Sequence, residues 1–238
     1  MRPLLLVTRP QPLATETAAA ASASGFDTLC APLLAIEDVP FAPPAEAPEA
    51  LLFTSPQAPP RAAAVGALRR VPAWTVGPRT AEAARAAGFS VVWTGQTDGR
   101  AALLAMAASG ITHALHPCGA ETAPADPPPG LRLERRTVYR ARAADRLPVP
   151  AAEALAAGRV AAVLLFSPRT AAVFAALADR AGLDRGRIAL AVISRAALAA
   201  AGPGWREAAV AESPEAASVL AAAAVLAPPS GARAEPAA

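Results

Sequence analysis

Four segments of the sequence end an apolar run with a hydroxyl or glycine residue and then continue into an alanine-rich stretch. They are Leu51–Pro56, Ala73–Phe89, Val163–Pro168 and, in shorter form, Ile193–Arg195. This order is typical of a buried strand that turns directly into a helix. The first N–H groups of a helix have no partner within it and lie at the positive end of its dipole. We therefore expect these turns to bind anions, with hydroxyl groups at the mouth of each helix.

The segment Ala73–Phe89 shows this pattern most completely. Ala73–Val76 is expected to form a strand, and Gly77 permits a sharp turn because it lacks a Cβ atom. A helix is expected from about Arg79, which places Thr80 in its first turn. The weaker copies of the pattern on either side of it indicate two related α/β halves.

The titratable residues do not form a recognisable catalytic or metal-binding set. Cys30 and Cys118 are far apart, and His113 and His116 have no further ligand at zinc spacing. We therefore expect no metal and no cofactor. The cysteines are interpreted as free structural thiols in a reducing compartment.

The charge balance favours an anionic ligand over nucleic acid. The chain has 238 residues and a formal net charge of +3, and every one of its 22 basic residues is an arginine. The arginines are scattered and no aromatic residues interleave with them, so a nucleic-acid surface is not expected. A GC-rich genome would produce the same bias toward alanine and arginine without any functional reason.

The sequence predicts a soluble, cytoplasmic protein. Leu4–Val7 is too short for the apolar region of a signal peptide, and the apolar run Ser218–Ala227 is too short to span a membrane. Neither membrane association nor an exposed apolar stripe is expected, so the chain is predicted to be a monomer.

Strands and helices alternate along most of the chain, which predicts parallel sheets. Pro-rich, charged crossovers near 37–48 and 140–147 bracket a middle block. The expected architecture is a first domain formed by 1–36 and 148–227, with a second domain, 49–139, inserted in it. The two linkers are expected to hinge around a cleft, and 228–238 is expected to be a disordered tail.

Three details of this element assignment deserve testing. A single strand is expected within Phe26–Ile36, with an irregularity at Pro32. Pro59 and Pro60 are expected to delay the following helix until near Arg61. The proline-rich segment 117–130 is interpreted as a loop, or as a helix that has been lost.

Several short motifs occur in an order that resembles the uroporphyrinogen-III synthase family. They are Val7-Thr8-Arg9-Pro10, Phe53-Thr54-Ser55-Pro56, Val76-Gly77-Pro78-Arg79-Thr80-Ala81, His116-Pro117-Cys118-Gly119, Thr137-Val138-Tyr139-Arg140 and Phe166-Ser167-Pro168. Each motif alone is weakly specific, whereas the ordered set covers nearly the whole chain before the tail.

The resemblance implies an α/β fold of two flavodoxin-like parallel-sheet domains joined by a two-stranded linker. It also implies that the linear tetrapyrrole hydroxymethylbilane binds between the domains and is cyclised to uroporphyrinogen III. Water is lost and ring D is inverted, through a spiro intermediate, without metal or cofactor. Hydroxymethylbilane synthase, which precedes this step, is a candidate partner. Hydroxyl-lined helix N-termini suit a polycarboxylate substrate. The reaction mainly requires the enzyme to hold the substrate in a folded conformation and to assist the departure of its hydroxyl group.

The resemblance also assigns roles to individual positions. It implies that Tyr139, the only tyrosine, and Thr80 are catalytic, with Tyr139 hydrogen-bonding or protonating the leaving hydroxyl. It implies substrate binding by eight further residues, namely Arg9, Thr54, Ser55, Gln57, Gly77, Gly119, Ser167 and Ser194. Structural alternatives stay open: linker packing for Tyr139, a helix-start residue for Thr80, a surface ion pair for Arg9, helix caps for Ser55 and Ser167, and turns for the glycines.

The chain departs from the family pattern at a few positions. Gln57 stands where the family often has Asn or Arg, Pro59 and Pro60 disturb the next helix, and Ala196 and Ala197 replace a pair of small hydroxyl residues. These departures motivate a second hypothesis, a degenerate paralogue that binds tetrapyrroles or other anions without catalysis.

Overall fold

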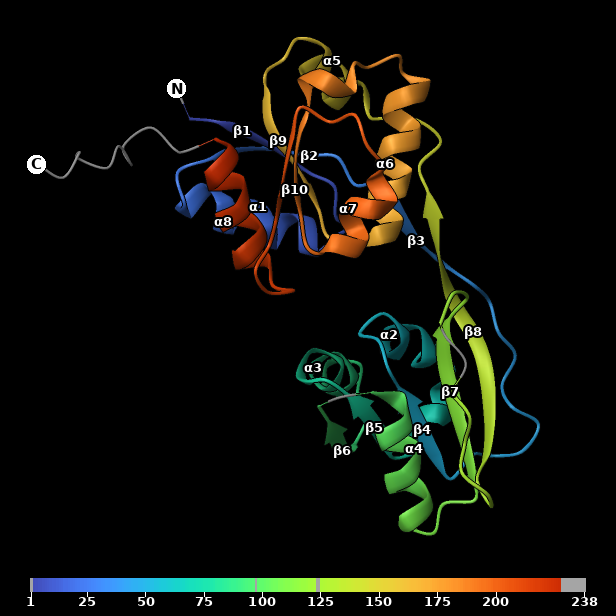
Figure 1. Ribbon diagram of the computed structural model, residues 1–238. Coiled ribbons are helices and arrows are strands. Elements are labelled where there is room, and N and C mark those ends of the chain that lie inside the picture. The colour runs from blue at the N-terminus through green and yellow to red at the C-terminus, as the bar shows by residue number, and fades with distance from the viewer. Residues whose placement is uncertain (1, 97, 123–124, 228–238) are drawn as a thin grey trace, which may run out of the picture. The chain divides into compact units, whose positions relative to one another are not determined.

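The computed structural model describes residues 2–96, 98–122 and 125–227. These residues form two compact units, one built from the chain up to Ala35 and from Arg142 onward, the other from Ile36–Ala141 (Figure 1). The expected tail, 228–238, lies outside the described residues. Within the described part of the chain, no helix is long and apolar enough to reach across a membrane.

The first unit is a five-stranded parallel sheet with helices on both faces. In space its strands run β11-β10-β9-β1-β2, which is the flavodoxin order 2-1-3-4-5 when they are numbered along the chain. Its elements are β1 (Leu4–Val7), α1 (Leu13–Ala23), β2 (Asp27–Cys30), α5 (Val149–Ala156), β9 (Val160–Leu165), α6 (Pro168–Arg180), η2 (Arg185–Arg187), β10 (Ala189–Val192), α7 (Arg195–Ala201), β11 (Glu207–Val210) and α8 (Ala216–Leu226).

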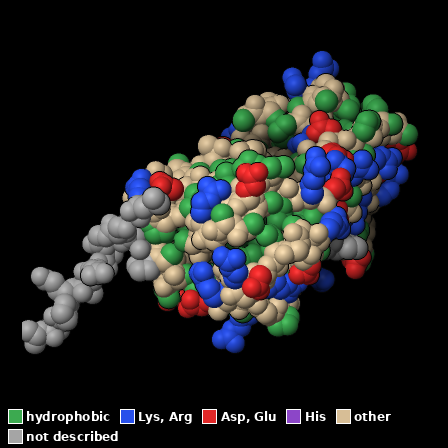
Figure 2. Space-filling view, turned by 90° about the horizontal axis from the view of Figure 1, so that it is seen from above, with side chains coloured by type: hydrophobic (Ala, Val, Ile, Leu, Met, Phe, Trp, Pro, Cys, Tyr) green, Lys and Arg blue, Asp and Glu red, His purple; other side chains and the backbone are tan. Residues whose placement is uncertain are grey.

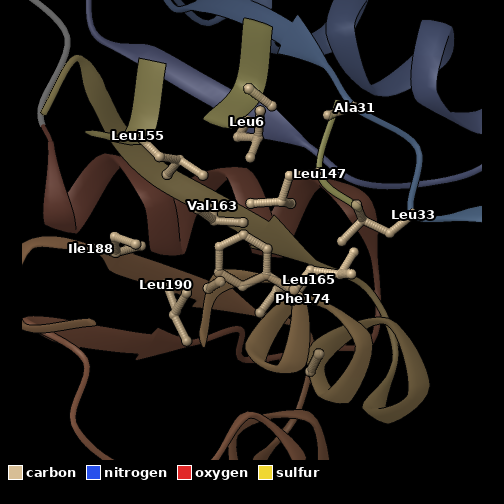
Figure 3. Close-up of a cluster of buried hydrophobic side chains, with 14 of the residues drawn as sticks. Leu6, Ala31, Leu33, Leu147, Leu155, Val163, Leu165, Phe174, Ile188 and Leu190 are labelled. Carbon is tan, nitrogen blue, oxygen red and sulfur yellow. The ribbon is translucent and has the colours of Figure 1, made fainter. Parts of the chain in front are cut away.

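The central strands of this sheet are apolar at successive positions because both of their faces are covered. Leu6 and Val163 point to the face packed by α5, α6 and α7, where Phe174 is fully buried (Figure 3). Leu5 and Leu164 point to the opposite face, which is packed by α1 and α8. The alternation of a strand's side chains thus supplies two separate cores from one short run.

The second unit contains a six-stranded sheet in the order β3-β8-β7-β4-β5-β6. Strands β4 to β8 are mutually parallel and, numbered along the chain, run 3-2-1-4-5, which differs from the order of the first unit. The elements are β3 (Leu34–Asp38), β4 (Ala50–Phe53), α2 (Ala58–Ala62), η1 (Gly66–Arg70), β5 (Ala73–Val76), α3 (Pro78–Ala86), β6 (Val91–Gly95), α4 (Gly99–Ala108), β7 (His113–Gly119) and β8 (Arg132–Ala143).

The two faces of this sheet are covered unequally. One face packs against α2, η1 and α3, and the other packs against α4. Between β7 and β8, residues 120–122 and 125–131 contain no helix, as the prolines there predicted.

The proline-based prediction for α2 was wrong. The helix begins at Ala58, so Pro59 and Pro60 lie in its first turn. First-turn N–H groups have no partner within a helix, so the missing N–H groups of these prolines cost little there.

The boundaries near the linkers also differ from the sequence-based assignment. The strand expected within Phe26–Ile36 is two strands, β2 and β3, which belong to different sheets. Strand β8 continues to Ala143, through the start of the expected 140–147 crossover. Strands β3 and β8 are hydrogen-bonded neighbours, with Val39 N–H donating to the Val138 carbonyl, 3.0 Å. This long-range pairing extends both strands in a way that local composition does not reveal.

Charged side chains are mixed on the face seen in Figure 2, where basic and acidic groups are interspersed. Exposed ion pairs occur in the described residues, for example Arg185 with Asp179 at 2.7 Å. Such a distribution is that of an ordinary solvated surface and not of a groove that follows a phosphate backbone.

The turn at Gly77 generates the first prediction. Gly77 has φ +81° and ψ 149°, a conformation that side chains with a Cβ rarely adopt. We expect Gly77→Ala to lower the free energy of unfolding by about 1–3 kcal/mol, measured by chemical denaturation. Gly66→Ala is the control, because Gly66 lacks a positive φ and a Cβ atom there meets nothing within 4 Å. Equal stability of the two variants would contradict the prediction.

Candidate functional site

Parallel strands end at one common edge, and ligands of doubly wound sheets bind at that edge where the strand order reverses. In the first unit the order reverses between β1 and β9, and in the second unit between β4 and β7. Most of the predicted site residues follow the carboxyl ends of these strands or of their neighbours. The structure therefore gathers the predicted residues at two sheet edges, one in each unit.

At the edge of the first unit, Arg9 follows β1 directly. Its guanidinium carbon lies 4.4 Å from the centroid of the Phe166 ring, and Nη1 donates to the Thr17 hydroxyl at 3.3 Å. The preceding residue, Thr8, is fully buried and donates its hydroxyl proton to the Leu164 carbonyl at 2.6 Å. Sequence reasoning gave Thr8 no role, although it joins β1 to β9 at the reversal point.

Ser167 and Ser194 cap the helices α6 and α7. The Ser167 hydroxyl oxygen accepts from the Thr170 N–H at 3.1 Å, and the Ser194 hydroxyl oxygen accepts from the Ala197 N–H at 3.2 Å. Capping is the structural alternative that the sequence left open for Ser167. The Ser167 hydroxyl also lies 2.9 Å from the Thr170 hydroxyl, where either oxygen can be the donor.

At the edge of the second unit, three predicted residues follow β4. Thr54 Oγ1 lies 3.0 Å from His116 Nε2, and the Ser55 hydroxyl accepts from the Gln57 N–H at 3.2 Å. The Gln57 carbonyl and side-chain oxygens accept from Arg61 Nη1, at 2.7 and 3.1 Å. Gln57, the N-cap residue of α2, is therefore held by Arg61 of the same helix.

The Thr80 side chain and the Gly77 N–H group are less available to a ligand than the sequence predicted. The Thr80 side chain is only 4% exposed, which favours its helix-start alternative. The Gly77 N–H donates to the Gly95 carbonyl at 2.8 Å, so this donor is already used within the sheet edge. The first-turn N–H groups of Arg79 and Thr80 are the donors that α3 offers at this edge.

The Tyr139 ring is held between a glycine and an arginine. A Cβ atom at Gly119 would lie 2.8 Å from the ring, so only glycine lets the ring take this position. On α2, the Arg61 guanidinium carbon lies 5.5 Å from the ring centroid, and Arg61 Nε donates to Asp38 at 2.7 Å. The Tyr139 hydroxyl has no hydrogen-bond partner within the described residues, so it can donate a hydrogen bond or a proton to a ligand.

Two residues of this edge, Arg61 and His116, were missed as functional candidates. Arg61 contacts Asp38 and the Tyr139 ring, which are distant from it in sequence, so no local pattern indicates it. His116 was considered in the sequence only as part of a motif and as a zinc ligand, which its spacing excluded. Its position in a fully buried strand was the available signal, because a buried polar side chain needs a partner.

Burial is the main cause of an altered His116 pKa. The side chain is 2% exposed, and burial together with the charge of Arg135 lowers its pKa from 6.5 to about 4. His116 is therefore a neutral hydrogen-bonding group at neutral pH. The edge as a whole offers hydroxyl groups, helix N-termini and arginines, which suit binding of a polyanion and donation of a proton from a hydroxyl.

Comparison with known proteins gives a consistent family match. The family model described as uroporphyrinogen-III synthase HemD matches residues 15–221. A search of curated proteins found no match. The structure is similar to that of uroporphyrinogen-III synthetase from Helicobacter pylori, with a TM-score of 0.60 and 16% identity over 95% of this chain and 100% of that one. A mutant uroporphyrinogen III synthase from Thermus thermophilus aligns with a TM-score of 0.47 and 19% identity, over 94% and 98% of the two chains.

The lowered pKa of His116 predicts a pH-dependent stability. In the unfolded chain His116 binds a proton near pH 6.5, whereas in the folded protein it does so only near pH 4. Its contribution is therefore complete above pH 6.5 and is lost as the pH falls toward 4. We expect the free energy of unfolding to fall by about 3 kcal/mol over this interval. Denaturation at several pH values measures it.

His116→Gln is the matched control for this pH dependence, because it replaces the titrating ring with a neutral polar side chain. The variant should lose most of the dependence between pH 6.5 and 4.5. Glu49 and Asp179, whose pKa values are lowered by hydrogen bonds from Thr112 and Arg185, act only at lower pH. An unchanged pH dependence in His116→Gln would contradict the assignment.

Proposed function

The chain belongs to the uroporphyrinogen-III synthase family, and we propose that the carboxyl edges of its two sheets bind the polycarboxylate substrate of that family. The protein is a cyclising lyase of heme biosynthesis. It closes hydroxymethylbilane into uroporphyrinogen III, with loss of water and inversion of ring D. The observation that carries the residue assignment is the gathering of hydroxyls, helix N-termini and Tyr139 at the carboxyl edges of the strands.

In this reaction, the binding residues donate hydrogen bonds to the carboxylates of the substrate. Arg9, Ser167 and Ser194 serve in the first unit, and Thr54, Ser55 and Gln57 serve in the second. Support comes from their chemistry: each offers an N–H or O–H group beside a helix start or strand end. Gly77 and Gly119 contribute by shape, since one makes a turn and the other admits the Tyr139 ring.

Tyr139 is the proposed donor to the departing hydroxyl group. Ring closure needs that hydroxyl to leave as water, so a proton must reach its oxygen as the carbon–oxygen bond breaks. The Tyr139 hydroxyl is supported in this role by its availability and by the two contacts that hold its ring. Thr80, being buried, is proposed to act through the N–H groups of the helix start and not through its hydroxyl.

The non-catalytic alternative is not favoured, and the departures that motivated it are accommodated in the structure. Pro59 and Pro60 fit the first turn of α2. Ser194 still caps α7 although Ala196 and Ala197 follow it, and Ala197 contributes its N–H to that cap. The Ser194 hydroxyl of this turn is therefore retained.

We further propose a cytoplasmic monomer that can receive its unstable substrate from hydroxymethylbilane synthase. Within the described residues, the large exposed hydrophobic side chains are Val92, Leu104, Val149 and Val225, and each lies on a different element. Cys30 and Cys118 are free thiols, which is the usual state in a reducing compartment.

An isomer assay tests the activity. Hydroxymethylbilane is generated enzymatically in the presence of this protein, and the products are oxidised and separated as type I and type III porphyrins. Type III should predominate, because only the enzyme inverts ring D, whereas spontaneous closure gives type I. If folded protein gives type I porphyrin alone, the result would contradict the activity and would favour the non-catalytic alternative.

Tyr139→Phe tests the proton donor. The variant keeps the ring and its contacts with Gly119 and Arg61 but removes the hydroxyl. We expect kcat to fall at least about tenfold with a much smaller change in KM, because the hydroxyl acts at the breaking bond. A rise in KM with unchanged kcat would show that the hydroxyl binds substrate and transition state equally.

A further inference from the structure

The contact between Thr54 and His116 lies at the point where the strand order of the second unit reverses. Thr54 directly follows β4, and His116 belongs to the neighbouring strand β7. Their polar atoms, Oγ1 and Nε2, are 3.0 Å apart. Either atom can be the donor. If Nε2 donates, the Thr54 hydroxyl accepts and its own proton can be donated to another group. If Oγ1 donates, that proton is used in the contact with His116.

The surroundings of the other ring nitrogen distinguish the two possibilities. His116 Nδ1 is buried and has no hydrogen-bond partner within the described part of the chain. His116 is opposite Arg135 in the register between β7 and β8, and Arg135 Nη2 donates to the Thr122 carbonyl at 2.7 Å and lies 4.0 Å from Cys118 Sγ. The local charge beside the imidazole is therefore positive.

A positive neighbour favours a lone pair, and not a proton, on the unpartnered nitrogen. If Nδ1 carried the proton, a buried N–H donor would be left without an acceptor next to a guanidinium group. If Nε2 carries it, the lone pair on Nδ1 is the negative end of the ring dipole and is attracted by Arg135. The ring is thus expected to be neutral and protonated on Nε2.

This tautomer sets the direction of the hydrogen bond to Thr54. The Nε2–H group donates and Thr54 Oγ1 accepts, so the hydroxyl proton of Thr54 must point elsewhere. The Thr54 methyl group faces the start of α4, where a Cβ atom at Gly99 would lie 3.5 Å from it. Oγ1 and the methyl group are both held, and His116 is the only side-chain partner of this hydroxyl within the described residues.

We propose that His116, as its Nε2–H tautomer, positions the Thr54 hydroxyl as a hydrogen-bond donor to a carboxylate of the substrate. Thr54 touches the substrate, and His116 is a positioning residue that acts through it. The identity of the ligand rests on the proposed function, whereas the tautomer and the direction of the hydroxyl are properties of the chain alone.

Nitrogen-15 NMR of the histidine rings tests the tautomer directly. The chain has two histidines, so His113→Gln leaves one ring signal, which belongs to His116. His113 is at the opposite end of β7, which makes this variant a suitable background. At pH 7 we expect a protonated Nε2 and an unprotonated Nδ1. The reverse pattern would overturn the proposal, whatever the activity of the enzyme.

Binding of uroporphyrin III, the stable oxidised product, tests the donor role without turnover. Thr54→Val keeps the shape but removes the hydroxyl, and His116→Leu removes the donor to it. Each should weaken binding about tenfold, and KM should rise more than kcat falls. His116→Gln retains an N–H donor and should bind within about threefold of the wild type.

The double variant separates positioning from a general structural effect. If His116 acts through Thr54, then Thr54→Val with His116→Leu should bind no more weakly than Thr54→Val alone. Additive losses in the double variant would overturn the proposal. So would wild-type binding by Thr54→Val or by His116→Leu. An inactive wild-type protein with the expected tautomer and binding losses would contradict the proposed function but not this inference.

Discussion

Parallel pairing of the strands is the constraint on which the rest of this structure depends. It sends β1, β2, β9, β10 and β11 of the first unit in one direction, and likewise β4 to β8 of the second, so the strand-to-helix turns of each unit open at one edge. Residues as distant as Arg9 and Ser167, or Thr54 and Tyr139, come to the same edge of a sheet for this reason alone. The chemistry of the chain is spread over many short motifs because each strand end contributes only one or two side chains.

Close backbone contacts give these edges their geometry. Gly119 has no side chain, and the Tyr139 ring occupies the space that a Cβ atom would need. Gly95 does the same for Trp93, whose ring stacks on Trp74 with centroids 5.5 Å apart. Glycine at such a position is therefore part of the environment of an aromatic ring.

Buried polar groups complete the edges and explain why few titrating residues are needed. Thr8 donates to a strand carbonyl, the capping serines accept from helix N–H groups, and His116 remains neutral because burial lowers its pKa. Donors that are already oriented require no reorganisation when a polycarboxylate binds. A reaction that mainly needs a held conformation and one leaving hydroxyl is consistent with such an edge.

The sequence by itself determined the alternation of strands and helices, the hydroxyl turns, the lack of a helix in 120–122 and 125–131, and the family. Each of these depends on local composition or on the order of the motifs along the chain. Tertiary structure alone decided the extension of β8 to Ala143, the strand order of each unit and the contacts of Arg61 and His116. These features depend on pairing and burial between residues far apart along the chain. Local propensity carries no information about such partners, so their roles become visible only when the sheets are assembled.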